Sequence, residues 1–129
     1  MPLGLPDFWQ GRRLPETTLS PYQWFLLGVA GGTLKAKSWG TLNVGTPEQG
    51  YAWVIYRVKV CTETNSLISV GISRAGTVFQ RETGYGIVEI NIPKGFDFRA
   101  GEYMTIDVYN YADFDINVLI NFSGLVVKL

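Results

Sequence analysis

The chain is predicted to fold as one all-β domain, an antiparallel β-sandwich or barrel that follows an extended N-terminal arm. Three observations predict this class. From Tyr22 onward, nearly every segment alternates apolar and polar residues or is a short run of β-branched and aromatic residues. Turn-forming residues recur about every ten positions, as they do in sandwiches and barrels. No window sustains a helical apolar period with caps, so eight or nine strands and no helix are expected.

Residues 1–21 form the predicted arm. Four prolines each fix φ and remove a backbone donor, which excludes a helix or a central strand: Pro2, Pro6, Pro15 and Pro21. The segment also carries large apolar side chains, which a solvated tail does not need: Leu3, Leu5, Phe8, Trp9 and Leu14. We therefore expect the arm to lie on its own domain or on a neighbouring subunit. Residues 22–129 are expected to form the sandwich domain.

The first half of the domain is expected to form four strands. Segments rich in glycine or proline separate them, at Ala30-Gly31-Gly32, at Gly40 and at residues 46–50. The expected strands are Tyr22–Val29, Thr33–Ser38, Thr41–Val44 and Tyr51–Cys61. In the last and longest strand, alternation assigns the residues to two faces. One face holds Val54, Tyr56, Val58 and Val60, and the opposite face holds Ile55, Arg57 and Lys59.

The second half reads as a hairpin followed by three more strands. The turn Arg74-Ala75-Gly76 joins the expected hairpin strands Leu67–Ser73 and Thr77–Arg81. Further turns are expected at Thr83–Gly86, at Pro93-Lys94-Gly95, which ends a strand, and at residues 110–113. The remaining strands are expected at residues 87–92, 103–109 and 115–127. The residues expected to share one face alternate along each: Val88, Ile90 and Ile92; Met104, Ile106 and Val108; Ile116, Val118, Ile120 and Phe122.

The C-terminal part is similar to the last strands of small jelly rolls. Its pattern is Pro93-Lys94-Gly95, then Ala100-Gly101-Glu102 before a strand, then Phe122-Ser123-Gly124 near the chain end. Such proteins include the trimeric heads of complement- and tumour-necrosis-type proteins, and small jelly-roll proteins on phage and virus surfaces, such as capsid decoration proteins and fibre heads. The resemblance covers residues 86–127 and implies a jelly-roll topology, with a trimer favoured. The arm shifts the choice towards virion proteins, in which such arms tie neighbouring subunits together.

Composition limits the classes of partner. Of the 129 residues, 17% are charged and 14% are aromatic, whereas a soluble domain has about 25% charged residues. This balance favours a surface covered by protein partners. The net charge is zero, so no general affinity for nucleic acid is expected. Residues 1–60 hold six basic and three acidic side chains and the remainder five and eight, a polarity that reflects either head-to-tail packing of like subunits or chance.

Catalysis and metal binding find little support in the residue types. The chain has no histidine, which excludes Ser-His-Asp and Cys-His catalysis, and its one cysteine, Cys61, cannot form a zinc cluster. Six carboxylates remain as acid or base candidates, unpaired by their spacing: Glu63, Glu82, Glu89, Asp107, Asp113 and Asp115. The loop Asn110–Asp115 offers oxygens that suit Ca²⁺, although an ordinary turn is the favoured alternative. We expect no enzyme, no cofactor and no metal site.

These observations favour a viral structural protein, a capsid decoration, cement or fibre-type subunit. It would form a homo-oligomer and attach to a major capsid or other virion protein through arm residues Leu5, Phe8, Trp9, Arg12 and Arg13. No basic and apolar leader opens the chain and no apolar stretch reaches the length of a membrane span. The protein is therefore expected to be made in a host cytoplasm and to reside in the virion.

The alternative function is that of a carbohydrate-binding module or adhesin head, which would bind a cell-surface glycan through exposed aromatic residues. Tyr109 is expected on the outward face of its strand, and Tyr111 on the loop that follows, so these two are the candidates. The other aromatic residues available for such a site are Trp24, Trp39, Trp53, Tyr51 and Tyr85.

Overall fold

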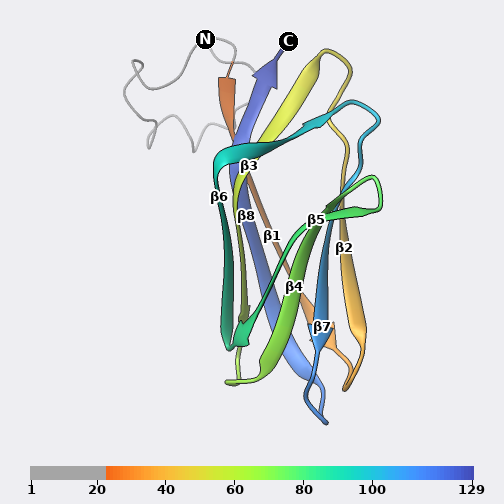
Figure 1. The fold of residues 1–129 in the computed structure, drawn as a ribbon, viewed down its shortest axis with the longest axis vertical. Helices are drawn as coiled ribbons and strands as arrows, with labels where there is room; N and C mark the ends of the chain where they lie inside the picture. Colours follow the sequence, from red (N-terminus) through yellow and green to blue (C-terminus); the bar gives the residue numbers. More distant parts are fainter. Residues whose placement is uncertain (1–22) are drawn as a thin grey trace.

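The computed structural model describes residues 23–129, which form eight β-strands and no helix (Figure 1). The strands are β1 (Gln23–Leu34), β2 (Trp39–Gly45), β3 (Tyr51–Thr62), β4 (Leu67–Arg74), β5 (Thr77–Tyr85), β6 (Ile87–Arg99), β7 (Met104–Asn110) and β8 (Ile116–Lys128). The predicted all-β class is confirmed for this part of the chain. It contains no helix that could span a membrane. The predicted arm, residues 1–21, lies outside the described residues.

The strands form two antiparallel sheets of four that pack face to face. Sheet A has the order β1-β8-β3-β6, and sheet B has the order β2-β7-β4-β5. Neighbours in a sheet are often distant in the chain: β1 pairs with β8 along its whole length, from Gln23 opposite Val127 to Leu34 opposite Ile116. Figure 1 shows the chain crossing repeatedly between the two layers. This is the strand order of an eight-stranded jelly roll, as the resemblance implied.

The core lies between the sheets and is built from alternate residues of each strand. On β7, Met104, Ile106 and Val108 are at most 1% exposed, whereas the residues between them face outward, as predicted. On β8 the predicted row of Ile116, Val118, Ile120 and Phe122 is buried as well. Strands β3, β4 and β6 supply most of the rest: Ile55, Val58, Val60, Ile68, Val70, Ile72, Val88, Ile90, Ile92, Phe96 and Phe98. Both sheets therefore keep an outer face, where functional groups can be presented.

Strand β1 runs through the glycines that were expected to interrupt it. The predicted break at Ala30-Gly31-Gly32 and the separate strand Thr33–Ser38 are wrong, because β1 pairs with β8 without interruption up to Leu34. The long apolar strand β8 holds β1 in register over that length. One glycine has a packing role: a Cβ atom on Gly28 would lie 2.1 Å from the ring of Phe122. The ring fills the space that a side chain at position 28 would need.

A β-bulge in β3 changes the faces on which its residues lie. In the pairing with β8, Ile55 and Arg57 lie opposite the consecutive residues Gly124 and Ser123, so Tyr56 is an extra residue of β3. The pairing with β6 shifts at the same place, where residues 92–95 of β6 are skipped. Ile55 is therefore fully buried together with Val58, whereas Tyr56 is 38% exposed. The predicted placement of Tyr56 with Val58, opposite Ile55, is wrong for this reason. Beyond the bulge, Arg57 and Lys59 lie opposite Val58, as predicted.

The connections around β5 and β6 agree with the prediction in part. The β4–β5 hairpin turns at Ala75 and Gly76, both with positive φ angles (49° and 87°). β5 continues to Tyr85, so the turn expected at residues 83–86 is confined to Gly86. Pro93 does not end β6, which continues past it. The pairing with β3 is nevertheless interrupted there, because residues 92–95 are skipped, and a proline is tolerated in such an irregular stretch of an edge strand.

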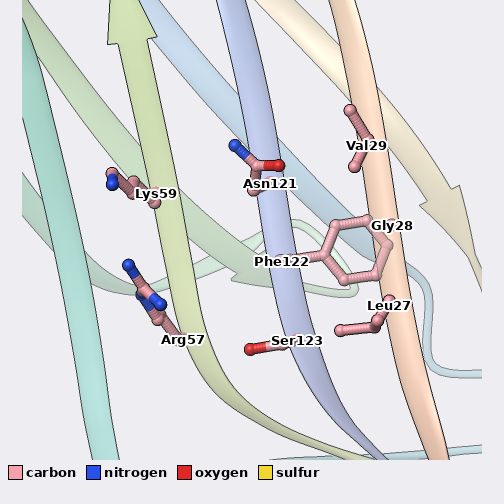
Figure 2. A pocket seen from close by; sticks show the side chains of 8 residues that line it. All are labelled: Leu27, Gly28, Val29, Arg57, Lys59, Asn121, Phe122 and Ser123. Atoms are coloured by element: carbon pink, nitrogen blue, oxygen red, sulfur yellow. The ribbon is translucent and has the colours of Figure 1, made fainter. Parts of the chain in front are cut away.

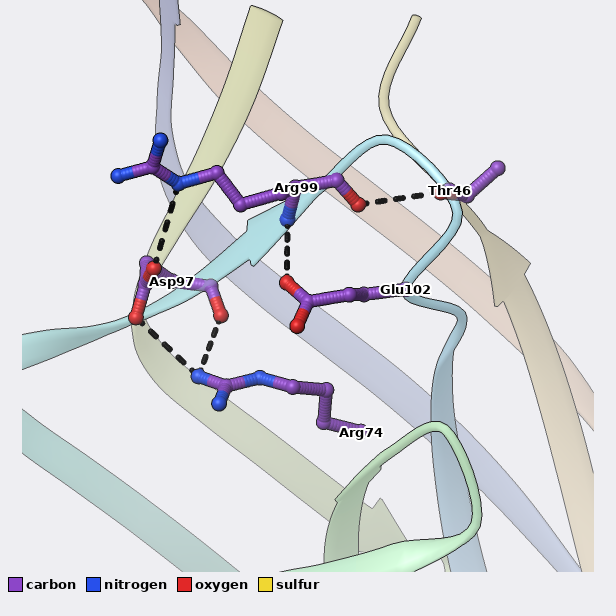
Figure 3. Close-up of polar contacts among 5 residues, drawn as sticks. All are labelled: Thr46, Arg74, Asp97, Arg99 and Glu102. Atoms are coloured by element: carbon purple, nitrogen blue, oxygen red, sulfur yellow. Dashed lines mark hydrogen bonds and ion pairs between the residues drawn. The ribbon is translucent and has the colours of Figure 1, made fainter.

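A cluster of polar side chains joins the two sheets near the β6–β7 connection (Figure 3). Arg74 of sheet B donates from Nη2 to the backbone oxygen of Asp97 in sheet A (2.6 Å) and to its Oδ1 (3.1 Å). Glu102 accepts a hydrogen bond from the backbone nitrogen of Arg99 at 2.7 Å, which closes the turn at residues 100–102. The Ala-Gly-Glu motif of the resemblance is thus a turn-forming element, and the cluster fastens one end of the sandwich.

Candidate functional site

The outer face of sheet B carries a cluster of three aromatic side chains. Tyr109 of β7 points outward, as predicted, and lies opposite Trp39 of β2. Their ring centres are 4.9 Å apart at an interplanar angle of 55°. Tyr111, on the loop after β7, packs edge-on against Tyr109 with the centres 4.6 Å apart. We call Trp39, Tyr109 and Tyr111 the aromatic platform, of which Trp39 and Tyr111 are 58% and 40% exposed.

The structure therefore brings the two predicted residues together and adds a third. Sequence reasoning named Trp39 among the available aromatic residues but did not place it beside Tyr109. The two are 70 positions apart, and only the β2–β7 pairing makes them neighbours. A weak signal does exist, because Trp39 and Thr41 alternate with Gly40 and Leu42, as outward residues of a half-buried strand do.

A polar row lies next to the platform on the same face. It contains one residue from each strand of sheet B, in the order Thr41, Asp107, Gly71 and Arg81. Arg81 Nη2 lies 3.8 Å from Asp107 Oδ2, and Asp107 Oδ1 accepts a hydrogen bond from Thr41 at 3.1 Å. Arg81 Nη1 donates to the hydroxyl of Ser69 at 3.2 Å. The Arg81 guanidinium carbon also lies 5.0 Å from the ring centre of Trp39, a distance at which the cation and the ring attract each other.

Gly71 allows Arg81 to lie across the face of the sheet. A Cβ atom at position 71 would lie 2.6 Å from Arg81 Nη2 and 2.8 Å from the guanidinium carbon. Glycine weakens a strand interior, and it often marks a place where another group approaches the backbone closely. The side chains of Arg81 and Asp107 are consequently only 32% and 23% exposed. Both charged groups are thus held in fixed positions beside the aromatic platform.

The loop considered for Ca²⁺ is organised by the buried side chain of Asn110. Its amide nitrogen donates to backbone oxygens, among them that of Phe114 at 2.9 Å. Asp113 forms an exposed ion pair with Lys37 at 3.5 Å, and Asp115 accepts a hydrogen bond from a backbone nitrogen of the β1–β2 turn at 3.0 Å. These contacts build a stable turn. Across residues 23–129, no group of three His, Cys, Asp or Glu side chains is placed to hold a metal ion.

The carboxylates considered as acids or bases lie at separate places and have different partners. Glu89 pairs with Arg57 on the outer face of sheet A. Glu63 accepts a hydrogen bond from Asn117 at 2.7 Å, and Asp107 belongs to the polar row of sheet B. Each of these three carboxylates therefore contacts its own basic, amide or hydroxyl group.

The outer face of sheet A is aliphatic where that of sheet B is aromatic. Leu27, Val29, Ile87 and Leu119 project from it and are 45 to 68% exposed; we call these four residues the aliphatic face. In the strand register Leu119 neighbours Cys61, which in turn neighbours Ile87. Cys61 is a free, half-buried cysteine. An apolar row thus crosses β8, β3 and β6.

A shallow depression of about 360 Å³ lies beside the aliphatic face. Figure 2 shows Leu27 and Val29 on β1 at one side and Arg57 and Lys59 on β3 at the other, with β8 between them. Arg57 is paired with Glu89. The side chain of Lys59 forms no ion pair or hydrogen bond within the described residues. This face therefore combines apolar contact area with a basic margin.

The arm residues that were predicted to bind a partner lie outside the described residues. These are Leu5, Phe8, Trp9, Arg12 and Arg13. Their role stays a prediction.

The comparisons with known proteins find similarity in structure only, since no family model and no curated protein matches the chain. The major capsid protein P2 of bacteriophage PM2 is similar with a TM-score of 0.53 and 8% identity, over 83% of this chain and 46% of that one. PirA (TM-score 0.52, 12% identity) is covered to 92% and covers 73% of this chain. The Yersinia pseudotuberculosis-derived mitogen (0.51, 10%) is covered to 85% and covers 76%.

The chain spans less than half of the length of the PM2 capsid protein. At identities of 8 to 12%, these similarities show the fold alone. The described residues form an all-β sandwich whose architecture is shared with a phage capsid protein and with proteins of other kinds.

Proposed function

We propose that this chain is a structural subunit of a virion, of the capsid decoration, cement or fibre type. In this proposal it forms a homo-oligomer, with the trimer favoured, on the surface of a particle made in a host cytoplasm. It is not an enzyme, and it uses no cofactor, metal or nucleic acid. The similarity in fold to a phage capsid protein supports the proposal. The aliphatic face is the observation that carries it.

The aliphatic face is what a subunit of an assembly needs and an isolated domain does not. Four large aliphatic side chains, each 45 to 68% exposed, project from one face of sheet A. Burying the exposed half of such a side chain contributes about 1 kcal/mol. Association of two such surfaces therefore supplies several kcal/mol before any polar contact is counted. The neighbouring subunit, or the major capsid or other virion protein, is the proposed partner.

The arm supplies a second point of attachment in this proposal. Phe8, Trp9 and Leu5 are the apolar anchors, and Arg12 and Arg13 pair with acidic groups on the partner. A subunit that is held both by a sheet face and by an arm gains from effective concentration, because binding of one part makes binding of the other intramolecular. The function is mechanical: added contact area stabilises the shell.

The solution mass tests this proposal directly. Multi-angle light scattering is performed on the full chain and on a chain that begins at Tyr22. We expect a trimer or a larger assembly for the full chain and a folded species of lower mass for the shortened one. Circular dichroism checks that the shortened chain retains its β-structure. Equal masses for both chains contradict the role of the arm, and a monomer at all concentrations contradicts the structural proposal.

A second candidate function is favoured by the aromatic platform. We propose that the platform binds a glycan on a cell surface, as a carbohydrate-binding module or adhesin head does. Exposed aromatic rings beside fixed polar groups are the usual composition of such sites. A glycan array tests it with the full chain, Tyr109→Ala and Tyr111→Ala. Binding that is lost in both variants supports the candidate, and an array without any bound glycan contradicts it. The two functions are compatible, because a decoration protein can also attach a particle to a cell.

A further inference from the structure

The ligand chemistry of the aromatic platform can be derived from the polar row beside it. The row presents a donor and an acceptor at once. Arg81 has five N–H donors, and its polar contacts are one hydrogen bond to Ser69 and the ion pair with Asp107. Asp107 is an acceptor that already receives one hydrogen bond, from Thr41. At 3.8 Å, the Arg81–Asp107 pair is too long for a good hydrogen bond. Both groups therefore retain capacity for a ligand.

The charge of the row excludes an anion as the preferred ligand. The positive charge of Arg81 is balanced by the carboxylate of Asp107, which lies two strands away on the same face of sheet B. An acidic sugar approaching Arg81 would be repelled by Asp107 and would have to replace it as the partner of the guanidinium. A hydroxyl group meets no such conflict, because it accepts from Arg81 and donates to Asp107.

The platform supplies the apolar half of the site. Trp39 is 58% exposed although Arg81 and Tyr109 both contact its ring. The C–H face of a pyranose ring is apolar and can cover an aromatic ring, while its hydroxyl groups project from the edge. Trp39 is adjacent to Arg81, so a ring stacked on the tryptophan brings its edge to the polar row.

We propose that the aromatic platform and the Arg81–Asp107 pair together bind a neutral saccharide. One pyranose ring stacks on Trp39, and neighbouring hydroxyl groups bridge Arg81 and Asp107. This inference rests on the proposal that the platform binds a glycan, and it adds the ligand class and two residues that select for it. The positioning residue is Gly71, because any side chain there would displace the guanidinium.

The test compares neutral with acidic oligosaccharides on the full chain. Neutral gluco-, manno- and galacto-oligosaccharides and their sialylated, uronate-containing and sulfated counterparts are arrayed, and hits are titrated at low and high salt. We expect the neutral ligands to bind, with an affinity that salt changes by less than about twofold. Trp39→Ala and Arg81→Gln should each weaken binding by roughly tenfold or more. The matched control is Tyr103→Ala, which removes another aromatic residue that is 58% exposed, immediately before β7, and should bind normally.

Gly71→Ala provides a second test, which leaves the side chains of Trp39, Tyr109 and Tyr111 unchanged. It should weaken saccharide binding while the tryptophan fluorescence change on binding is retained at saturation. A preference for acidic saccharides with strong salt dependence overturns this inference and leaves glycan binding itself standing. The same holds if neutral ligands bind Trp39→Ala, Arg81→Gln and Gly71→Ala as tightly as the Tyr103→Ala control. An array without any bound saccharide overturns both proposals.

Discussion

The two outer faces of the sandwich both belong to four-stranded antiparallel sheets, but they differ in side-chain chemistry. On sheet B, the exposed rings of the aromatic platform adjoin Arg81 and Asp107, which are themselves held by neighbouring side chains. On sheet A, the exposed groups are aliphatic, and Lys59 at their margin has no partner within the described residues. Fixed polar groups beside rings suit a small ligand that needs directed hydrogen bonds. Aliphatic groups with a basic margin suit a larger, less directional protein contact.

The difference also shows in how each sheet uses glycine. In sheet A, Gly28 faces inward, and the ring of Phe122 occupies the space beside it. In sheet B, Gly71 faces outward, and Arg81 occupies the equivalent space. A substitution at Gly28 therefore disturbs the core, whereas one at Gly71 disturbs the surface. The roles of the two glycines can therefore be distinguished by experiment: a substitution at Gly28 should change stability, and one at Gly71 should change binding.

The largest expected effect is on self-association. Leu119→Asp combined with Ile87→Asp places two carboxylates on the aliphatic face, where an interface would have to desolvate them. We expect the association constant to fall by at least about a hundredfold, as measured by sedimentation at several concentrations. The unfolding free energy should change by less than about 1 kcal/mol, because both side chains are already about half exposed.

A matched pair on sheet B serves as the control for that prediction. Tyr111→Asp combined with Thr83→Asp adds the same charge to the other outer face. Association should be unaffected by this pair. If it is this pair that abolishes association, and the sheet A pair has no effect, the roles assigned to the two faces are reversed.

The next effect, in order of size, is on stability. Gly28→Ala forces a Cβ atom against the ring of Phe122, at a separation of 2.1 Å before relaxation. Such overpacking costs about 1–3 kcal/mol. Gly32→Ala, on the same strand and face, meets nothing within 4 Å and should change stability by about 0.5 kcal/mol or less. Urea unfolding measures both stability losses. Equal losses would show that the Phe122 ring can move to make room for a side chain at position 28.

In the same experiment, the stability loss caused by Gly71→Ala should lie between the losses caused by Gly28→Ala and Gly32→Ala. Its Cβ atom meets the far end of the flexible Arg81 side chain, which can move away. We expect a stability loss of at most about 1 kcal/mol.

Much of the fold could be predicted from the alternation of apolar and polar residues along each strand, and the exceptions have identifiable causes. Alternation predicted the inward rows of β7 and β8 correctly, because the register shifts in their pairing place the extra residue on the partner strand, β2 or β3. It failed in β3, where the bulge at Tyr56 in the pairing with β8 places Ile55 in the core. It failed in β1, because pairing with β8 outweighs the weak strand propensity of three small residues. Bulges and partner strands are tertiary features, which alternation along one strand does not encode.

The candidate site could be predicted only in part for the same reason. Tyr109 and Tyr111 are two residues apart in the chain, so their proximity follows from local sequence. Trp39 and Arg81 join them through strand pairs that link distant segments. An outward arginine and an inconspicuous glycine at position 71 carry no signal until the sheet order is known. Strand alternation did predict the outward position of Tyr109, but the partners of its ring depend on the sheet topology.

The smallest expected effect distinguishes the two ion pairs on the outer faces. Arg57 and Glu89 on sheet A are 47% and 36% exposed, whereas Arg81 and Asp107 on sheet B are 32% and 23% exposed. Exposed pairs contribute little to stability because water and salt screen them. Glu89→Gln should therefore change the unfolding free energy by less than about 0.5 kcal/mol. Asp107→Asn should cost about 1 kcal/mol, because it leaves a half-buried guanidinium with less compensation and weakens the bond to Thr41. Urea unfolding at low and high salt measures both. If the two variants lose equal stability and both losses depend on salt, the charges on sheet B are held no more firmly than those on sheet A. The polar row is then an ordinary solvated surface.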